Sequence, residues 1–320
     1  NLQFGQSGSS ASHLSIEGLT FTGGGTGLNI GKCSELWIDR CTIQSMQERG
    51  ITAESSDTDR IHITRCEISG CAVGPGISMG RSNGLVINSQ SVIALNHVHD
   101  IAGSSTGGGI WIRQLSWGNL VSGNLVHDTE LPNIFLAGAG ANPVNVVENN
   151  ICYRCTGDYG LRVTADCVVR NNLAFSDFAG PFLSSPYQSA TPTRITVVQN
   201  TFIGTEGAAR MVSWSGGNGL VFANNACYAQ TGNAINITGG NGSTVFAGLV
   251  TYGGVTAGIP STVSSGGLAD FVNVTWNGTS RDATPSASSP LRSAANAAYL
   301  TEYDLSYFLR TLPASTGGSR

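Results

Sequence analysis

The stretch NNICYRCTGDYGLRVTADCVVRNNLAF, residues 149–175, holds one complete period of a repeat and the start of the next. Related tetrapeptides lie on both sides of it: GLTF at 18–21, RCTI at 40–43, RCEI at 65–68, LNHV at 95–98, GNLV at 123–126, QNTF at 199–202, NNAC at 224–227 and AGLV at 247–250. They recur about every 25 residues, which is a period typical of a solenoid.

Each period contains three short runs in which apolar and polar residues alternate, such as VNVVE, NICY and GLRVT. Alternation with period two predicts strands that have one face in a core. Three strands per turn without a helical stretch predict an all-β protein, a single-stranded right-handed parallel β-helix of about ten coils. The asparagines at equivalent positions between 96 and 225 predict an asparagine ladder, in which each amide bonds to neighbouring turns.

These repeats, together with NHVHD at 96–100 and NLVHD at 124–128, resemble the right-handed parallel β-helix (PbH1-repeat, pectate-lyase-like) carbohydrate-active proteins. The segment SSPLRSAANAAYLTEYDLSYFLR at 288–310 is similar to the ending of many such proteins. The group includes polysaccharide lyases, epimerases and glycoside hydrolases, and the subfamily stays open. The resemblance implies a polysaccharide or oligosaccharide partner and a secreted or cell-surface location.

The chain is expected to have three parts. Residues 1–12 are interpreted as a leader or cloning remnant, residues 13–255 as the β-helix and residues 256–320 as a C-terminal cap or tail. Open ends of a solenoid expose core and strand edges, so the cap is expected to supply apolar plugs. The candidate plugs are Leu300, Tyr303, Leu305, Tyr307 and Phe308.

Composition limits the partners. The formal net charge is −4 and the basic residues do not cluster, so we expect no nucleic-acid binding. No apolar run of about 18 residues exists, so we expect no membrane span. Both a monomer and a trimer remain open. Lys32 is the only lysine, which leaves any cationic role at a site to arginine.

The eight cysteines allow more than one interpretation. Cys41 and Cys66 occupy equivalent repeat positions and are expected to be buried as small apolar side chains. The spacings of Cys66 with Cys71, and of Cys152 with Cys155, would also allow short disulfide loops.

The best candidate site follows the Asn positions of two successive repeats. Val98 should point into the core, which places His97 and His99 outside, with Asp100 next to them. One turn later come His127 and Asp128. Turns of a parallel solenoid stack about 4.8 Å apart, so His99 should lie beside His127.

The next strand of each turn adds a wall to this site, with Trp111, Arg113 and Phe135 facing outward as contacts for a sugar chain. The catalytic candidates are His99, Asp100, Arg113, His127, Asp128, Tyr153, Asp158 and Arg162. The substrate-binding candidates are Glu54, His97, Trp111, Glu130, Phe135, Arg154, Tyr159 and Asp177.

Lysis of a uronate polymer is the leading hypothesis. It requires neutralisation of the C6 carboxylate, removal of the C5 proton and protonation of the leaving oxygen. The candidates for these roles, in that order, are Arg113 or Arg162, His127 or His99, and Tyr153 or Tyr159.

Two other functions use the same surface. A glycoside hydrolase would use Asp100 with Asp128, or Asp128 with Asp158, as its paired carboxylates. A non-catalytic glycan-binding or structural β-helix would use the Val-His-Asp motifs only to shape the strand ends. No metal ligands are assigned and no cofactor is required, although the acidic rim leaves Ca²⁺ as an option.

Overall fold

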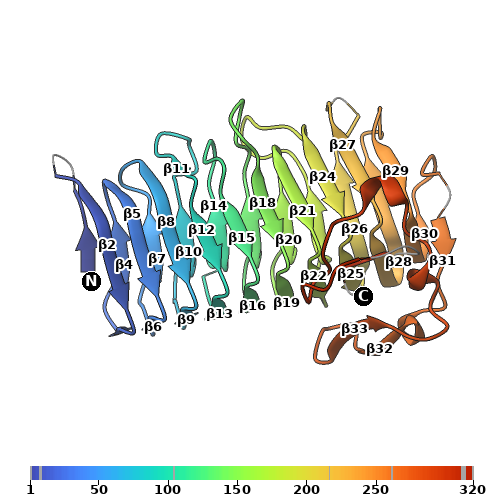
Figure 1. Cartoon of the computed structure of the whole chain (residues 1–320), viewed down its shortest axis with the longest axis horizontal. Helices are drawn as coiled ribbons and strands as arrows, with labels where there is room; N and C mark the ends of the chain where they lie inside the picture. The colour runs from blue at the N-terminus through green and yellow to red at the C-terminus, as the bar shows by residue number, and fades with distance from the viewer. Residues whose placement is uncertain are drawn as a thin grey trace. The chain divides into compact units, whose positions relative to one another are not determined.

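The computed structural model describes residues 2–6, 9–103, 105–215, 217–260, 262–310 and 315–318. In these ranges the regular elements are β-strands, apart from three 3-10 turns: η1 (Leu268–Asp270), η2 (Pro290–Arg292) and η3 (Ala297–Tyr299). The strands form a right-handed parallel solenoid of about ten turns, which confirms the predicted fold (Figure 1). The chain has two compact units: unit 1 is Asn1–Val146 with Cys155–Gly157, and unit 2 is Val147–Arg154 with Asp158–Arg320.

Unit 1 consists of three rows of parallel strands, and each turn contributes to every row. The first row is β2 (Ala11–Glu17), β5 (Cys33–Asp39), β8 (Thr58–Thr64), β11 (Asn88–Ser89), β12 (Val92–Ala94) and β15 (Leu120–Ser122). The second row is β3 (Thr20–Thr22), β6 (Thr42–Gln44), β9 (Glu67–Ser69), β13 (His97–Ile101) and β16 (Leu125–Thr129). The third row is β1 (Leu2–Phe4), β4 (Leu28–Ile30), β7 (Ile51–Ala53), β10 (Ile77–Met79), β14 (Ile110–Ile112) and β17 (Ile134–Leu136).

Unit 2 repeats the same order of strands. Its elements are β20 (Leu161–Val163), β21 (Cys167–Arg170), β22 (Leu173–Ser176), β23 (Phe182–Ser184), β24 (Ile195–Val198), β25 (Thr201–Gly204), β26 (Gly207–Val212), β27 (Leu220–Ala223), β28 (Ala226–Thr238), β29 (Val245–Ala247), β30 (Leu249–Val255), β31 (Thr262–Ser264), β32 (Phe271–Val274) and β33 (Arg281–Pro285). The strands β18 (Asn145–Glu148) and β19 (Ile151–Cys155) contain residues of both units. Unlike the others, β32 and β33 form an antiparallel hairpin.

The core is built from one inward side chain at the same place in each turn. In the second row of unit 1, Ile43, Ile68 and Val98 are in register and have no exposed surface. Burial of such a side chain stabilises the fold by about 1.5–3 kcal/mol. In unit 2 the position in register is occupied by Ala174, Phe202 and Cys227, and the Phe202 ring stacks on Phe182 of the neighbouring strand row with centroids 4.9 Å apart.

All eight cysteines are buried and free. Cys41 and Cys66 meet at the expected repeat position, where the Cys41 amide donates to the Cys66 Sγ at 3.4 Å. Burial raises the pKa of the Cys66 and Cys71 thiols to about 12, so both stay protonated near neutral pH. The cysteines therefore pack as small apolar side chains, and the short loops considered for them are not closed.

The asparagine repeat marks a corner at which the backbone amides need side-chain acceptors. In unit 2 the Asn150 Nδ2 donates to the Asn172 Oδ1 at 3.0 Å, and Asn172 donates to Asn200 at 2.9 Å. The same oxygens also accept from the backbone N–H of the preceding turn's asparagine at 3.0 and 2.9 Å. The residue before the corner has a positive φ, 57° at Asn149 and 54° at Asn171, a conformation that asparagine tolerates well.

The two ends of the chain differ from what the sequence suggested. Residues 2–4 were expected to precede the solenoid, but Leu2–Phe4 pairs in register with Leu28–Ile30. At the other end, parallel pairing continues beyond residue 255, since Thr262 is the partner of Leu249. Strand pairing rather than composition sets these boundaries.

The sequence suggested that side chains of the C-terminal tail plug the end of the core, and this prediction is wrong for the aromatic residues. Tyr303, Tyr307 and Phe308 keep 44%, 56% and 59% of their surfaces exposed, while Leu300 and Leu305 are half-buried. Polar contacts hold the tail instead: Asn171 donates to the Tyr303 carbonyl at 2.7 Å and accepts from the Thr301 hydroxyl at 2.9 Å. Residues 261, 311–314 and 319–320 of the expected cap lie outside the described residues.

The asparagine corner leads to a stability prediction. Asn172 is fully buried, and its removal would leave the Asn150 N–H groups and the Val147 carbonyl without their partner. We expect Asn172→Ala to lower the free energy of unfolding by roughly 2–4 kcal/mol in urea denaturation. The exposed Asn218 is the control, and Asn218→Ala should change it by less than about 0.5 kcal/mol. Equal effects of the two substitutions would contradict this account.

Candidate functional site

Three of the five histidines of the chain meet on the outer face of the second row in unit 1. The buried Val98 and Val126 are in register, and His99 lies directly opposite His127 on the neighbouring strand. The predicted alternation and register of this segment are therefore confirmed. We call His97, His99 and His127 the histidine cluster.

The rings of the histidine cluster are in direct contact. The His97 and His99 ring centroids are 4.2 Å apart, and His99 stacks on His127 at 5.2 Å with an angle of 15° between the rings. His97 Nε2 lies 2.8 Å from His127 Nε2, so one of the two nitrogens donates to the other. Such a hydrogen bond requires at least one uncharged ring.

A carboxylate fixes the orientation of two of the rings. Asp100 Oδ2 is 2.7 Å from His99 Nδ1, and Asp128 Oδ2 is 2.6 Å from His127 Nδ1. Both aspartates have positive φ values, 55° and 52°, which turn their side chains back toward the preceding histidine. Because each carboxylate accepts the Nδ1 proton, we assign the neutral rings a lone pair on Nε2.

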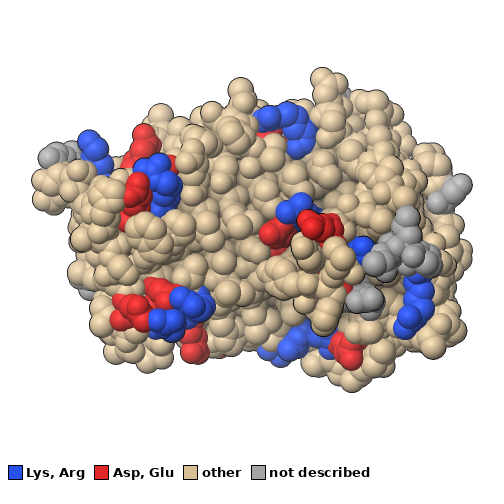
Figure 2. Space-filling model, viewed as in Figure 1, with Lys and Arg blue, Asp and Glu red and all other residues tan. Residues whose placement is uncertain are grey.

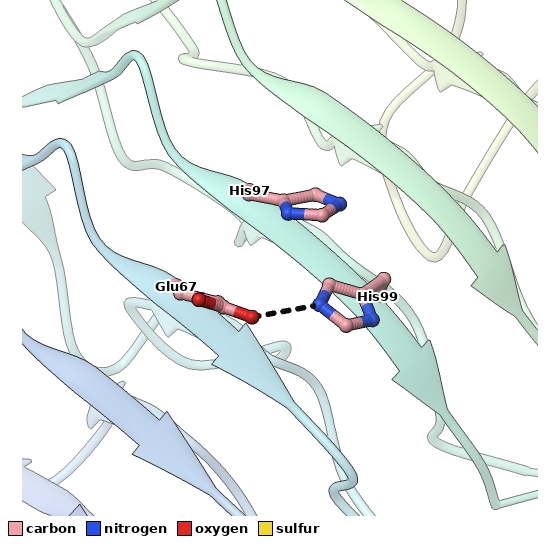
Figure 3. Close-up of side chains that lie close together, drawn as sticks. All are labelled: Glu67, His97 and His99. Atoms are coloured by element: carbon pink, nitrogen blue, oxygen red, sulfur yellow. Dashed lines mark hydrogen bonds and ion pairs between the residues drawn. The ribbon is translucent and has the colours of Figure 1, made fainter. Parts of the chain in front are cut away.

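Glu67 completes the group from the adjacent strand β9, where it lies in register with His97. Its Oε1 is 3.4 Å from His99 Nε2, as Figure 3 shows. Burial, together with the positive charges that His99 and His127 carry when protonated, lowers the pKa of His97. His97 is accordingly neutral near pH 7. Glu67 was not among the predicted site residues, although alignment of RCEI at 65–68 with LNHV at 95–98 puts it at the same repeat position as His97.

The wall residues are in the predicted register but are not exposed. Trp111 pairs with Phe135, and their rings make an edge contact at 5.9 Å. They keep only 6% and 4% of their surfaces exposed, which differs from the open sugar platform expected. The loop at Gly108 covers the indole ring. Its backbone lies so close that a Cβ atom at this position would be only 2.0 Å from the Trp111 indole nitrogen.

Arg113 is held inside this wall. Its guanidinium carbon lies 4.1 Å above the Trp111 ring, and its Nε donates to the Ser78 Oγ at 3.3 Å. Glu54 is 3.8 Å from the same guanidinium and accepts a short hydrogen bond from Ser78. With 8% of its surface exposed, Arg113 already has a carboxylate partner within the protein.

Glu130, another expected substrate contact, supports the loop between β13 and β14. Its Oε2 accepts from the Gly103 amide at 2.7 Å. A carboxylate that satisfies a loop amide positions the backbone, and Glu130 therefore has a structural contact whatever it binds.

The candidates in unit 2 form their own contacts. Arg281 of β33 and Arg154 lie over the Tyr153 ring, 4.1 and 4.9 Å from its centroid, and leave Tyr153 only 5% exposed. Arg162 donates to Asp158 at 2.9 Å.

A small pocket of about 180 Å³ lies near the remaining candidates of unit 2. Its lining includes Tyr159, whose hydroxyl accepts from Arg210 at 3.3 Å. Asp177 is exposed. Arg210 and Arg281 were not predicted as site residues, because nothing in the repeat pattern marks either one.

Charged side chains elsewhere on the surface lie in small mixed groups, as Figure 2 shows for one face. In unit 1, for example, Arg65 is 2.6 Å from Asp39, and Arg60 is 3.0 Å from Glu35. The Arg65 guanidinium holds the pKa of Asp39 below its usual value. The described residues contain no helix long and apolar enough to cross a membrane.

Comparison with known proteins identifies the architecture. The family model described as "Right handed beta helix region" matches residues 4–202. A crystal structure of pectate lyase Pel9A shares 14% identity, with 92% of this chain and 73% of that one covered and a TM-score of 0.54. No curated protein matches the sequence.

Two further solved structures are similar over part of their length. The periplasmic alginate epimerase AlgG shares 14% identity over 78% of this chain and 56% of its own, with a TM-score of 0.47. XylC, solved in complex with xylose, shares 11% identity over 75% and 52%, with a TM-score of 0.48. The chain thus spans little more than half of these two proteins.

The buried position of Arg113 can be tested directly. Arg113→Met removes the partner of Glu54 and Ser78 but keeps an apolar side chain over Trp111. We expect a loss of about 1–3 kcal/mol in the free energy of unfolding. Arg81 is exposed, so Arg81→Met should be neutral within about 0.5 kcal/mol. If the Arg113→Met variant is as stable as the wild type, the guanidinium contacts do not contribute to the stability of the fold.

Proposed function

The chain belongs to the right-handed β-helix family, and from this premise we propose that it cleaves an acidic, uronate-containing polysaccharide by β-elimination. The proposal includes action outside the cell, as a secreted or cell-surface protein. One observation supports it most directly. Two histidines, each oriented by the aspartate that follows it, lie side by side on the outer face of the second strand row, where His127 keeps 9% of its surface exposed.

The proposed base is His127. Its Nδ1 faces Asp128 at 2.6 Å, which leaves the lone pair on Nε2. This nitrogen lies 2.8 Å from His97 Nε2, and it removes a proton once that hydrogen bond opens. As the C5–H bond of the uronate breaks, its electrons form the C4–C5 double bond. The C4–O bond breaks in the same step, its electrons go to the leaving oxygen, and that oxygen takes a proton from solvent. Asp128 stabilises the imidazolium that forms, as a carboxylate does in other histidine-based sites. His99 has the same arrangement and is the alternative base.

Hydrolysis by paired carboxylates has less support. Asp100 and Asp128 each face the Nδ1 of the adjacent histidine at 2.7 and 2.6 Å. A hydrolase needs one carboxyl to protonate the glycosidic oxygen and the other to attack the sugar or activate water. Carboxylates committed to orienting imidazoles are poorly placed for that work, so we keep hydrolysis and simple glycan binding as outcomes of the test.

The test is incubation with polymers of galacturonate, of mannuronate and guluronate, and of glucuronate. Ultraviolet absorbance of unsaturated products supports elimination, and new reducing ends without it indicate hydrolysis. Retention of a polymer without products indicates a binding module. We expect His127→Ala to lower turnover of a cleaved polymer by about 10²–10⁴-fold, the usual contribution of a general base.

The control is His62, a half-buried histidine of the first row that stacks on Trp37 with centroids 4.9 Å apart. His62→Ala should keep the wild-type rate. Full activity of a folded His127→Ala variant would show that the base lies elsewhere.

A further inference from the structure

We propose that Glu67, His97 and His99 bind a divalent transition metal ion of the Zn²⁺ class, with His127 beside the open coordination position. Figure 3 shows these three side chains projecting from β9 and β13 toward the same space. Their donor atoms all lie within 4.8 Å of one another. Side chains that collect on one metal ion show this convergence before the ion is bound.

The strands hold the donors in place. His97 and His99 are two residues apart on β13, so period-two alternation puts both on the outer face. Glu67 is the direct register partner of His97 on the adjacent parallel strand β9. Three donors from a paired backbone are preorganised, and little ordering is needed when the ion binds.

The carboxylates behind the rings match the usual surroundings of a histidine ligand. A metal-binding imidazole commonly donates its other N–H to a carboxylate, which orients the ring and makes the ligating nitrogen more basic. Asp100 does this for His99, through the 2.7 Å contact to Nδ1. Nε2 of His99 then faces Glu67 at 3.4 Å. Two lone-pair donors facing each other are stabilised when a cation lies between them.

The donor set selects the kind of ion. Two imidazole nitrogens and one carboxylate suit zinc and its neighbours, whereas Ca²⁺ prefers six to eight oxygens. Zinc–ligand bonds of about 2.0–2.2 Å place tetrahedral donors about 3.3 Å apart. The 3.4 Å between Glu67 and His99 already fits. Glu67 has a side chain 53% exposed and can close the remaining gap by rotation.

Three protein ligands leave one position for water or a substrate oxygen, the pattern of a catalytic site. On binding the ion, His97 would exchange its 2.8 Å hydrogen bond with the His127 Nε2 for a metal bond. On the proposed function, the ion would bind the uronate carboxylate and neutralise its charge. Arg113 is poorly suited to that role, because it is buried against Trp111 and near Glu54.

The experiment is titration calorimetry of the whole chain, without a polyhistidine tag, with ZnCl₂, together with metal analysis after dialysis. We expect one ion per chain. His99→Ala and His97→Ala should weaken binding by about 100-fold or more, and Asp100→Asn, which only orients a ligand, by about 10-fold. His62→Ala should bind like the wild type, and His127→Ala within a few-fold of it. Absence of a one-to-one complex, or wild-type affinity in His99→Ala, would overturn the site.

The two proposals can fail separately. Zinc binding without turnover of any uronate polymer would reject the lyase and keep the metal site. Turnover that survives removal of metal by a chelator, in a chain that binds no zinc, would reject the metal site and keep the lyase.

Discussion

The buried backbone amide at one corner of each turn is the group on which the structure depends. The chain bends there through a residue with positive φ, and an acceptor must be found for the next N–H. The Oδ1 of the following turn's asparagine supplies it at Asn96, Asn150, Asn172 and Asn200. This bond ties each of these turns to the next in a fixed register, and in an earlier turn the Cys66 Sγ accepts from the Cys41 N–H instead. A slip of one residue would reverse every outward and inward side chain, so the site depends on this corner too.

Much of this could be predicted from the sequence, because the corner leaves a visible pattern. Double asparagines recur because the first tolerates the left-handed conformation and the second supplies the buried amide. In unit 2 the first asparagine has another task that the pattern does not reveal: Asn224 donates to the carbonyls of Asn296 and Tyr299 in the tail. The tail was misjudged because backbone carbonyls, rather than its aromatic side chains, make these contacts. Every residue has a backbone carbonyl, so the sequence does not show which carbonyls make these contacts.

The strand positions of the site residues could also be predicted from the sequence, but their exposure could not. Period-two alternation and the turn-to-turn register placed His99 beside His127. The exposure of Trp111 was not predictable, because it depends on where the loop at Gly108 folds. Glu67 was missed for a different reason. A single glutamate on an outward strand position is ordinary, and it acquires meaning only when the register sets it against His97.

The electrostatics of the histidine cluster link its possible partners. His97 Nε2 and His127 Nε2 share a hydrogen bond of 2.8 Å, which requires one of these two rings to be uncharged. With neutral rings, Glu67, Asp100 and Asp128 leave the surface strongly negative. A cation bound here would reduce the repulsion between this surface and an acidic glycan. The carboxylates that orient the imidazoles would therefore favour a cation beside an acidic substrate, which links the two proposals without making either one depend on the other.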